Sequence, residues 1–124
     1  MSAPTALRVT LRIDVGGRRT LGPGKVRLLE LVGELGSISA AARGMGMSYR
    51  RAWTLVESLN GSFGVPLVAA KPGGAGGGGA QLLPAGAEVV RLYRTLEAKV
   101  GDTNEDALRG LAALLNTPQP APDG

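Results

Sequence analysis

The chain has 124 residues, which is enough for one small domain with or without an appended arm. It contains no cysteine and no histidine, which excludes disulfides, thiolate metal sites and catalysis that depends on either residue. Fourteen Lys and Arg against ten Asp and Glu give a net charge of +4, and this favours an anionic partner. Aromatic residues make up only 3% of the chain, so we expect an aliphatic core.

Hydropathy and motifs exclude further classes of protein. No segment is apolar over the roughly 18 residues that span a bilayer, and the N-terminus lacks the features of a signal peptide, so we expect a cytoplasmic protein with no membrane partner. Gly74–Gly79 satisfies the G-x-G-x-x-G pattern. This run lies between two short expected strands, whereas a dinucleotide site joins a strand to a helix. We therefore predict no cofactor, no metal site and no catalytic residue.

The first expected element is a strand over residues 7–15. Apolar and polar residues alternate there without interruption, from Leu7 to Val15, as in a strand with one buried face. Gly16-Gly17 supplies a tight turn, and residues 18–21 return as a short second strand. This hairpin forms an expected N-terminal arm over residues 1–22.

Three helices are expected next. Residues 25–35 have helical periodicity, Gly36 ends that helix, and Ser37 or Ser39 can cap a second one over residues 39–43. Ser48 can cap a third helix over about residues 49–60. The inner face of that helix is expected to carry Ala52, Val56 and Leu59. Two short helices joined by a Gly-containing turn form a helix-turn-helix, although the pattern also fits an ordinary pair of packed helices.

The start of the third helix carries the candidate DNA-binding side chains. In a helix-turn-helix this end enters the major groove, where arginine can donate two hydrogen bonds to guanine. Hydroxyl groups and free N–H groups at a helix start can bind phosphate. The candidates are two serines at the start of the second helix and six residues at the start of the third: Ser37, Ser39, Ser48, Tyr49, Arg50, Arg51, Trp53 and Thr54. Alternatives stay open: the two arginines can be a solvated pair, Trp53 can be a core residue, and Tyr49 can hold the turn to the core.

A second hairpin is expected after the third helix. Two apolar runs, residues 65–71 and 80–83, flank a glycine-rich segment and predict strands with a long tip over residues 72–79. A hairpin in this position is the wing of a winged helix. Lys71 and the backbone of Gly76, Gly77 and Gly78 can lie against DNA phosphates. The alternative is a flexible linker.

The last part of the chain is expected to be helical. Pro84 suits the first turn of a helix over residues 85–100, and another helix follows it. The first of these has an apolar stripe, which can serve a homodimer, a heterodimer or the chain's own core; it consists of Val89, Leu92, Tyr93, Leu96 and Val100.

These elements predict a mainly α fold with small β-hairpins, in which a winged helix-turn-helix precedes a long C-terminal dimerisation helix. The expected parts after the arm are a DNA-binding domain over residues 23–84 and a helical dimerisation segment over residues 85–116. Residues 117–124 are rich in proline and are expected to be a disordered tail.

Three segments together resemble a known family: Gly36-Ser-Ile-Ser-Ala-Ala-Ala42, Ser48-Tyr-Arg-Arg-Ala-Trp53 and the glycine-run wing. Over roughly residues 7–100 the sequence is similar to the N-terminal DNA-binding domain of molybdate-responsive (ModE-type) transcriptional regulators, which share a winged helix-turn-helix with LysR-type regulators. The resemblance implies that Tyr49, Arg50 and Arg51 face the groove, that the wing touches the backbone, and that the helix after Pro84 helps to form a homodimer. Full-length members carry molybdate-binding domains after this point. Because this sequence ends at Gly124, we expect a regulator without them.

The expected function is a sequence-specific transcriptional regulator that binds double-stranded DNA as a homodimer and is not an enzyme. One alternative is an interaction module that forms a heterodimer with a full-length regulator through the helices after Pro84. The other is a small oxyanion-binding protein in which backbone N–H groups and arginines hold molybdate or tungstate.

Overall fold

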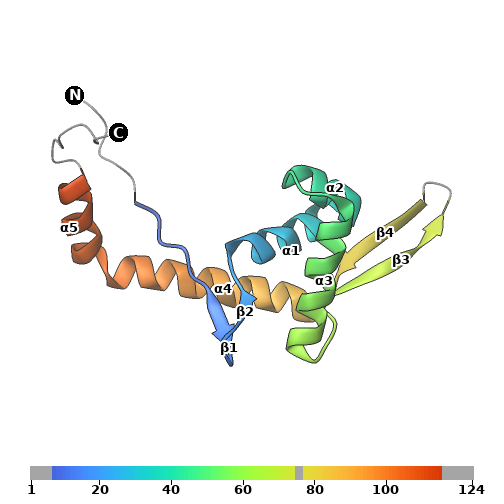
Figure 1. Ribbon diagram of the computed structural model, residues 1–124, viewed down its shortest axis with the longest axis horizontal. Helices are drawn as coiled ribbons and strands as arrows, with labels where there is room; N and C mark the ends of the chain where they lie inside the picture. Colours follow the sequence, from blue (N-terminus) through green and yellow to red (C-terminus); the bar gives the residue numbers. More distant parts are fainter. Residues whose placement is uncertain (1–6, 75–76, 116–124) are drawn as a thin grey trace.

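The computed structural model describes residues 7–74 and 77–115, which form five helices and two hairpins. Figure 1 shows α1, α2, α3 and one hairpin gathered near the start of the long helix α4, with α5 at its far end. In chain order the elements are β1 (Ile13–Val15), β2 (Arg18–Leu21), α1 (Pro23–Leu35), α2 (Ile38–Gly44), α3 (Tyr49–Phe63), β3 (Val68–Gly74), β4 (Gly77–Leu82), α4 (Pro84–Thr103) and α5 (Glu105–Leu115). The predicted fold class is confirmed.

The core lies where the first three helices meet, and it is aliphatic apart from one tyrosine. The side chains predicted on the inner face of α3 (Ala52, Val56 and Leu59) are all buried. Tyr93 of α4 is 1% exposed, and its hydroxyl donates a 2.6 Å hydrogen bond to the Leu11 carbonyl. The other large, fully buried side chains are Val26, Leu28, Leu29, Val32 and Leu67.

The helix ends follow local signals that the sequence contains. Gly36 adopts a left-handed φ of 65° and its N–H donates to the Val32 carbonyl at 2.8 Å. Of the two candidate caps for α2, Ser37 takes the role, because its Oγ accepts the Ala40 N–H at 3.0 Å. Ser48 caps α3 by accepting the Arg51 N–H at 3.0 Å. The helix predicted over residues 39–43 therefore begins one residue earlier, and α3 runs three residues past its predicted end at residue 60.

The strand predicted over residues 7–15 is wrong for residues 7–12, since β1 is only Ile13–Val15. Its partner β2 has only four residues, so residues 7–12 have no strand residues opposite them with which to pair. The alternation nevertheless persists as half-buried Leu7, Val9 and Leu11 between exposed residues. This segment approaches α4 through the hydrogen bond between Leu11 and Tyr93 (Figure 1). Val15 was expected on the buried face, but it lies near the hairpin tip and is 61% exposed.

The long tip predicted for the second hairpin is also wrong. The two strands continue through the glycine run, where Lys71 pairs with Gly79 and Gly74 pairs with Gly77. Glycine gives no alternating side-chain pattern to read, yet its backbone N–H and C=O pair like those of any residue. Gly76, a predicted phosphate contact, lies outside the described residues.

Helix α4 is longer than predicted, and the residues of its predicted apolar stripe differ in burial. Pro84 is in the first turn of α4, as predicted, and the helix continues to Thr103. Tyr93 is buried in the chain's own core, Val89 and Val100 are half-buried, and Leu92 and Leu96 are each 48% exposed. The predicted tail, residues 117–124, lies outside the described residues.

Within residues 7–74 and 77–115, no helix is both long and apolar enough to cross a bilayer.

Candidate nucleic-acid interface

The helix-turn-helix is formed by α2, the turn over residues 45–48, and α3. Small residues at the crossing allow the two helix backbones to approach closely, and Ala41, Ala42 and Ala52 are all buried there. Gly46 has a left-handed φ of 66°, and the next N–H, of Met47, donates to the Ala42 carbonyl at 3.0 Å. These contacts set the direction in which α3 leaves the turn, so the position of its first residues is fixed by packing on α2.

Arg50 and Arg51 lie at the exposed start of α3. Their side chains have no hydrogen bond or ion pair with any part of the chain that the structure describes. Ala52 and Val56 face the core from the opposite side of the helix. Two guanidinium groups are therefore presented to solvent on the face where a helix-turn-helix meets DNA.

The predicted hydroxyl contacts are engaged within their own helices. Ser37 and Ser48 are caps, Ser39 accepts a 3.2 Å hydrogen bond from Arg43 Nη1, and Thr54 Oγ1 donates to the Arg50 carbonyl at 3.0 Å. A hydroxyl that accepts one hydrogen bond can still donate its own proton. Ser48, which is exposed, thus keeps a donor for a phosphate oxygen.

Tyr49 and Trp53 form an aromatic pair on the outer side of α3. Their ring centroids are 6.3 Å apart at an interplanar angle of 79°, an edge-to-face arrangement. Trp53 is half-buried and packs against the core, whereas Tyr49 is 55% exposed. The core interpretation of Trp53 therefore holds for part of its ring, and the rest of the ring supports Tyr49.

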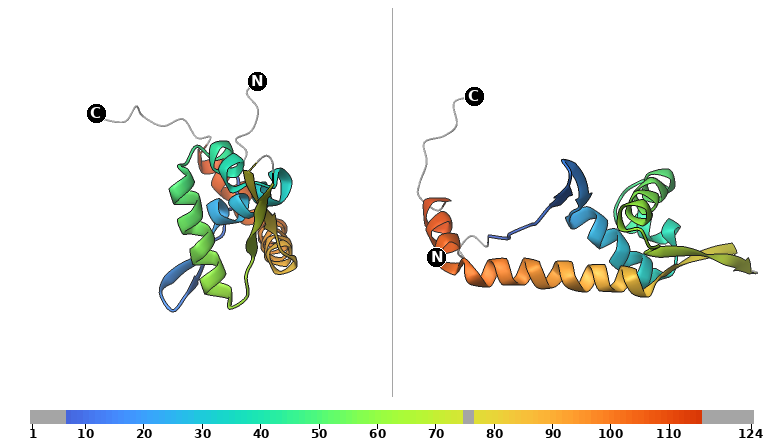
Figure 2. Two further views of the ribbon diagram at one scale, coloured as in Figure 1. Left: turned by 90° about the vertical axis from the view of Figure 1, so that its right-hand side faces the viewer. Right: turned by 90° about the horizontal axis from the view of Figure 1, so that it is seen from below.

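Asn60 of α3 fixes the wing, β3–β4, by its side chain. Its Oδ1 accepts the N–H groups of Leu67 at 2.7 Å and Val68 at 3.2 Å, while Nδ2 donates to the Val68 carbonyl at 3.1 Å. The other strand is held by Ala80, whose N–H donates to the Gly36 carbonyl at 3.0 Å. The wing projects away from the helices with Lys71 exposed (Figures 1 and 2).

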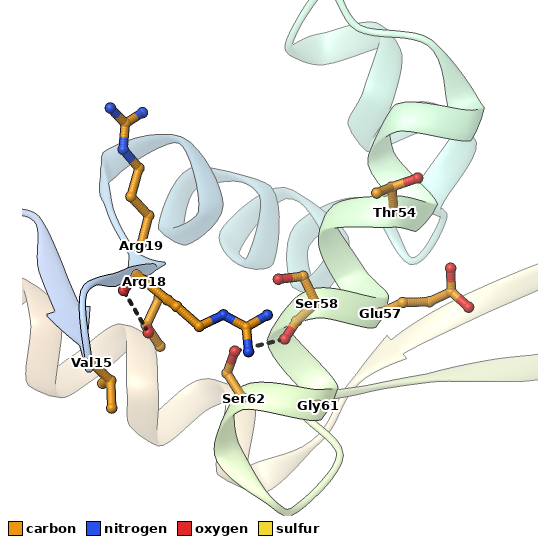
Figure 3. A pocket seen from close by; sticks show the side chains of 9 residues that line it. Val15, Arg18, Arg19, Thr54, Glu57, Ser58, Gly61 and Ser62 are labelled. Atoms are coloured by element: carbon orange, nitrogen blue, oxygen red, sulfur yellow. Dashed lines mark hydrogen bonds between the residues drawn. The ribbon is translucent and has the colours of Figure 1, made fainter.

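A second basic element, which was not predicted from the sequence, lies beside α3: the hairpin β1–β2. Lys25 Nζ donates to the Thr20 carbonyl and to Ser58 Oγ, both at 3.3 Å, and so links this hairpin to α3. A hollow of about 800 Å³ lies between the two, with Arg18 and Arg19 along its hairpin side (Figure 3). The available signal was the pair of arginines directly after the Gly16-Gly17 turn.

Positive charge is concentrated on the helix-turn-helix side of the molecule. Residues 8–71 contain ten of the fourteen cationic residues and four of the ten acidic ones. In α4 and α5, by contrast, Arg91, Arg94 and Arg109 are all paired with glutamates. Arg94 also binds Glu30 of α1 through two hydrogen bonds of 3.1 and 2.9 Å, which lowers the pKa of that carboxyl group.

Within residues 7–74 and 77–115, no group of three or more His, Cys, Asp or Glu side chains lies close enough together to hold a metal ion. The geometry instead combines exposed arginines, a capped helix start and projecting hairpins, which suits a polyanion.

Comparison with known proteins agrees with this geometry. Residues 24–87 match the family described as "Bacterial regulatory helix-turn-helix protein, lysR family". The molybdenum-pterin-binding protein MopB of Rhodobacter capsulatus is 48% identical over 80 residues, which are 64% of this chain and 30% of MopB. The molybdenum transport protein ModE of Azotobacter vinelandii is 38% identical over 109 residues, 88% of this chain and 38% of ModE. The chain thus spans well under half the length of either relative.

A solved structure supports the fold. A LysR family transcriptional regulator superposes with a TM-score of 0.50 at 24% identity, covering 66% of this chain and 26% of that protein. The family match confirms the predicted helix-turn-helix DNA-binding domain related to ModE regulators, which is a regulatory and not an enzymatic domain. The chain therefore belongs to the lysR family of bacterial regulatory helix-turn-helix proteins.

Proposed function

We propose that the chain is a sequence-specific transcriptional regulator that binds DNA as a homodimer, with the start of α3 in the major groove. The observation that carries this proposal is the exposed Arg50–Arg51 pair, which has no partner in the described residues and lies on a helix start fixed by the Ser48 cap. Arginine forms two hydrogen bonds with guanine O6 and N7, the commonest specific contact with a base. Tyr49 and Thr54 are exposed beside this pair.

In this proposal residues 23–84 bind DNA, and the wing contacts the sugar-phosphate backbone through Lys71 and the glycines of β4. Lys71 is exposed, and Gly77 and Gly78 of β4 have no side chain to hinder the approach of a phosphate to the backbone. Such contacts add affinity for any sequence, while α3 supplies the preference among sequences.

The proposed dimer uses the exposed part of the apolar stripe on α4, within residues 85–116. Leu92 and Leu96 are each 48% exposed, and no described residue of α5 is buried. Short helices depend on packing of their apolar face for stability, so these surfaces favour a partner. The same exposed leucines also support the second candidate, a module that pairs with a full-length regulator.

The groove contact is tested by selection from fragmented genomic DNA at about 0.15 M salt, followed by binding measurements on the recovered site. Arg50→Ala is expected to weaken binding by about 1–3 kcal/mol and to relax the preference at one base pair. Lys71→Ala should weaken all sequences equally. Recovery of DNA without any recurrent site would contradict sequence-specific binding.

The dimer is tested by sedimentation of the purified protein and of the double variant Leu92→Glu/Leu96→Glu. We expect a dimer that this variant converts to a monomer, whereas Ala98→Glu, an exposed position elsewhere on α4, leaves it intact. A parent protein that is monomeric at all concentrations, with or without DNA, would remove the homodimer and favour the heterodimer module.

A further inference from the structure

The hairpin β1–β2 lies beside α3 on the flank away from the wing. Both Figure 1 and the right-hand view of Figure 2 place β1–β2 and β3–β4 on opposite sides of α3. Besides the hollow of about 800 Å³, a smaller one of about 330 Å³ runs from the hairpin to Arg51 near the start of α3. Arg19 borders both hollows, so the surface between hairpin and helix is continuous along α3.

The charges of this surface are available to a ligand. Arg18 and Arg19 are exposed and form no ion pair within residues 7–74 and 77–115. Asp14, the acidic residue of the hairpin, is already bound to Arg12 at 3.1 Å. Glu57 also borders the larger hollow, but Figure 3 shows its carboxylate directed away from both arginines.

The α3 side of the larger hollow is polar, and Ser58 keeps a hydroxyl proton that it can donate to an oxyanion. Ser58 and Ser62 line it, and Figure 3 shows Arg18 directed toward both of them. Ser62 Oγ donates to the Ser58 carbonyl at 2.8 Å, and Ser58 Oγ accepts from Lys25. Guanidinium groups bind phosphate with two parallel hydrogen bonds, so a cluster of this kind is suited to a phosphodiester.

We propose that β1–β2 is a second backbone clamp, in which Arg18 and Arg19 bind phosphates of duplex DNA on the side of α3 opposite to the wing. The inference rests on the proposed function, because α3 must lie in the groove for the hairpin to reach the flanking strand. DNA binding then uses two hairpins, and the N-terminal one supplies more of the charge.

The test is the salt dependence of binding to a duplex, measured for the parent protein and for Arg18→Gln/Arg19→Gln. Each phosphate contact contributes about 0.9 to the slope of log K against log salt concentration, so losing two contacts reduces the slope by about 1.8. Arg18→Lys/Arg19→Lys keeps the charges and should restore most of the slope. The matched control is Arg8→Gln/Lys99→Gln, which removes two exposed charges remote from α3 and should leave the slope unchanged. Equal urea midpoints for all variants show that folding is retained.

The outcomes separate the clamp from the proposed function. Binding by the parent with an unchanged slope in Arg18→Gln/Arg19→Gln would overturn the clamp alone, as would an equal loss in the control variant. A parent protein that binds no duplex would overturn both. If inorganic phosphate alone binds to the parent and not to the Gln variant, while the slope stays unchanged, the arginines hold a free oxyanion and the clamp is wrong.

Discussion

The two hairpins differ in length, in charge and in how the helices hold them: the strands have 3 and 4 residues in β1–β2 and 7 and 6 in β3–β4. The wing segment, residues 68–82, contains a single cation, Lys71, and is attached to α3 by the neutral side chain of Asn60. The hairpin β1–β2 contains two arginines in its second strand and is attached through the ammonium group of Lys25. In the proposed complex, α3 would thus be flanked by two hairpins that are attached to it in different ways.

The largest expected effect comes from a glycine that lets the wing meet α4. A Cβ on Gly86 would lie 2.4 Å from the Leu67 carbonyl oxygen, so Gly86→Ala forces the backbone to shift. We expect the free energy of unfolding to fall by about 3 kcal/mol, measured by urea denaturation. The control is Gly101→Ala in the same helix, where nothing lies within 4 Å and helix propensity favours alanine. Equal stabilities for the two variants would show that this contact is not tight.

Removing the amide of Asn60 should release the wing and leave the other hairpin in place. Asn60→Ala leaves two N–H groups and one carbonyl without their partner, which we expect to cost about 2 kcal/mol. Amide exchange should become faster in Leu67 and Val68 and stay unchanged in residues 18–21. Asn60→Asp keeps the acceptor oxygen for the N–H groups of Leu67 and Val68, so it should reduce the free energy of unfolding by less than Asn60→Ala does. Faster exchange in both hairpins would contradict independent attachment.

Lys25 provides the converse change. Lys25→Met keeps an apolar stem but loses the hydrogen bonds to Thr20 and Ser58, and we expect a cost of about 1 kcal/mol. Amide exchange should then become faster in residues 18–21, whereas Leu67 and Val68 keep their protection. Lys99→Met, an exposed position on α4, is the charge-matched control. No difference between the two lysine variants would mean that packing alone holds the hairpin.

An effect no larger than that of Lys25→Met is expected at the ion pair between Glu30 of α1 and Arg94 of α4. The hydrogen bonds from Arg94 lower the pKa of Glu30 below its ordinary value of 4.5 in the folded state. The pair therefore stabilises the fold above pH 4.5, and this contribution is lost as the pH falls through the lowered value. Glu30→Gln should cost about 1 kcal/mol near neutral pH. The cost should shrink steadily as the pH is lowered below 4.5. A constant difference across that range would exclude titration of Glu30 as the cause.

The sequence predicted the parts of this arrangement that depend on near neighbours. The caps Ser37 and Ser48 and the stop at Gly36 act within four residues, so their positions are readable without a structure. The contacts that attach the N-terminal segment to the helices could not be predicted in this way. Lys25 and Ser58 are 33 positions apart in the sequence, and Leu11 and Tyr93 are 82 apart. No local pattern indicates such contacts. The extent of the wing strands was also unreadable, since a run of glycines has no alternation.

The central claim is that α3 reads the major groove while both hairpins hold the flanking backbone. Hydroxyl-radical footprinting on the recovered site tests it most directly. The account predicts protected sugars on both sides of each groove segment read by α3, repeated with two-fold symmetry, and loss of one side in Arg18→Gln/Arg19→Gln. Protection on the wing side alone, or uniform weak protection with no defined site, would contradict it.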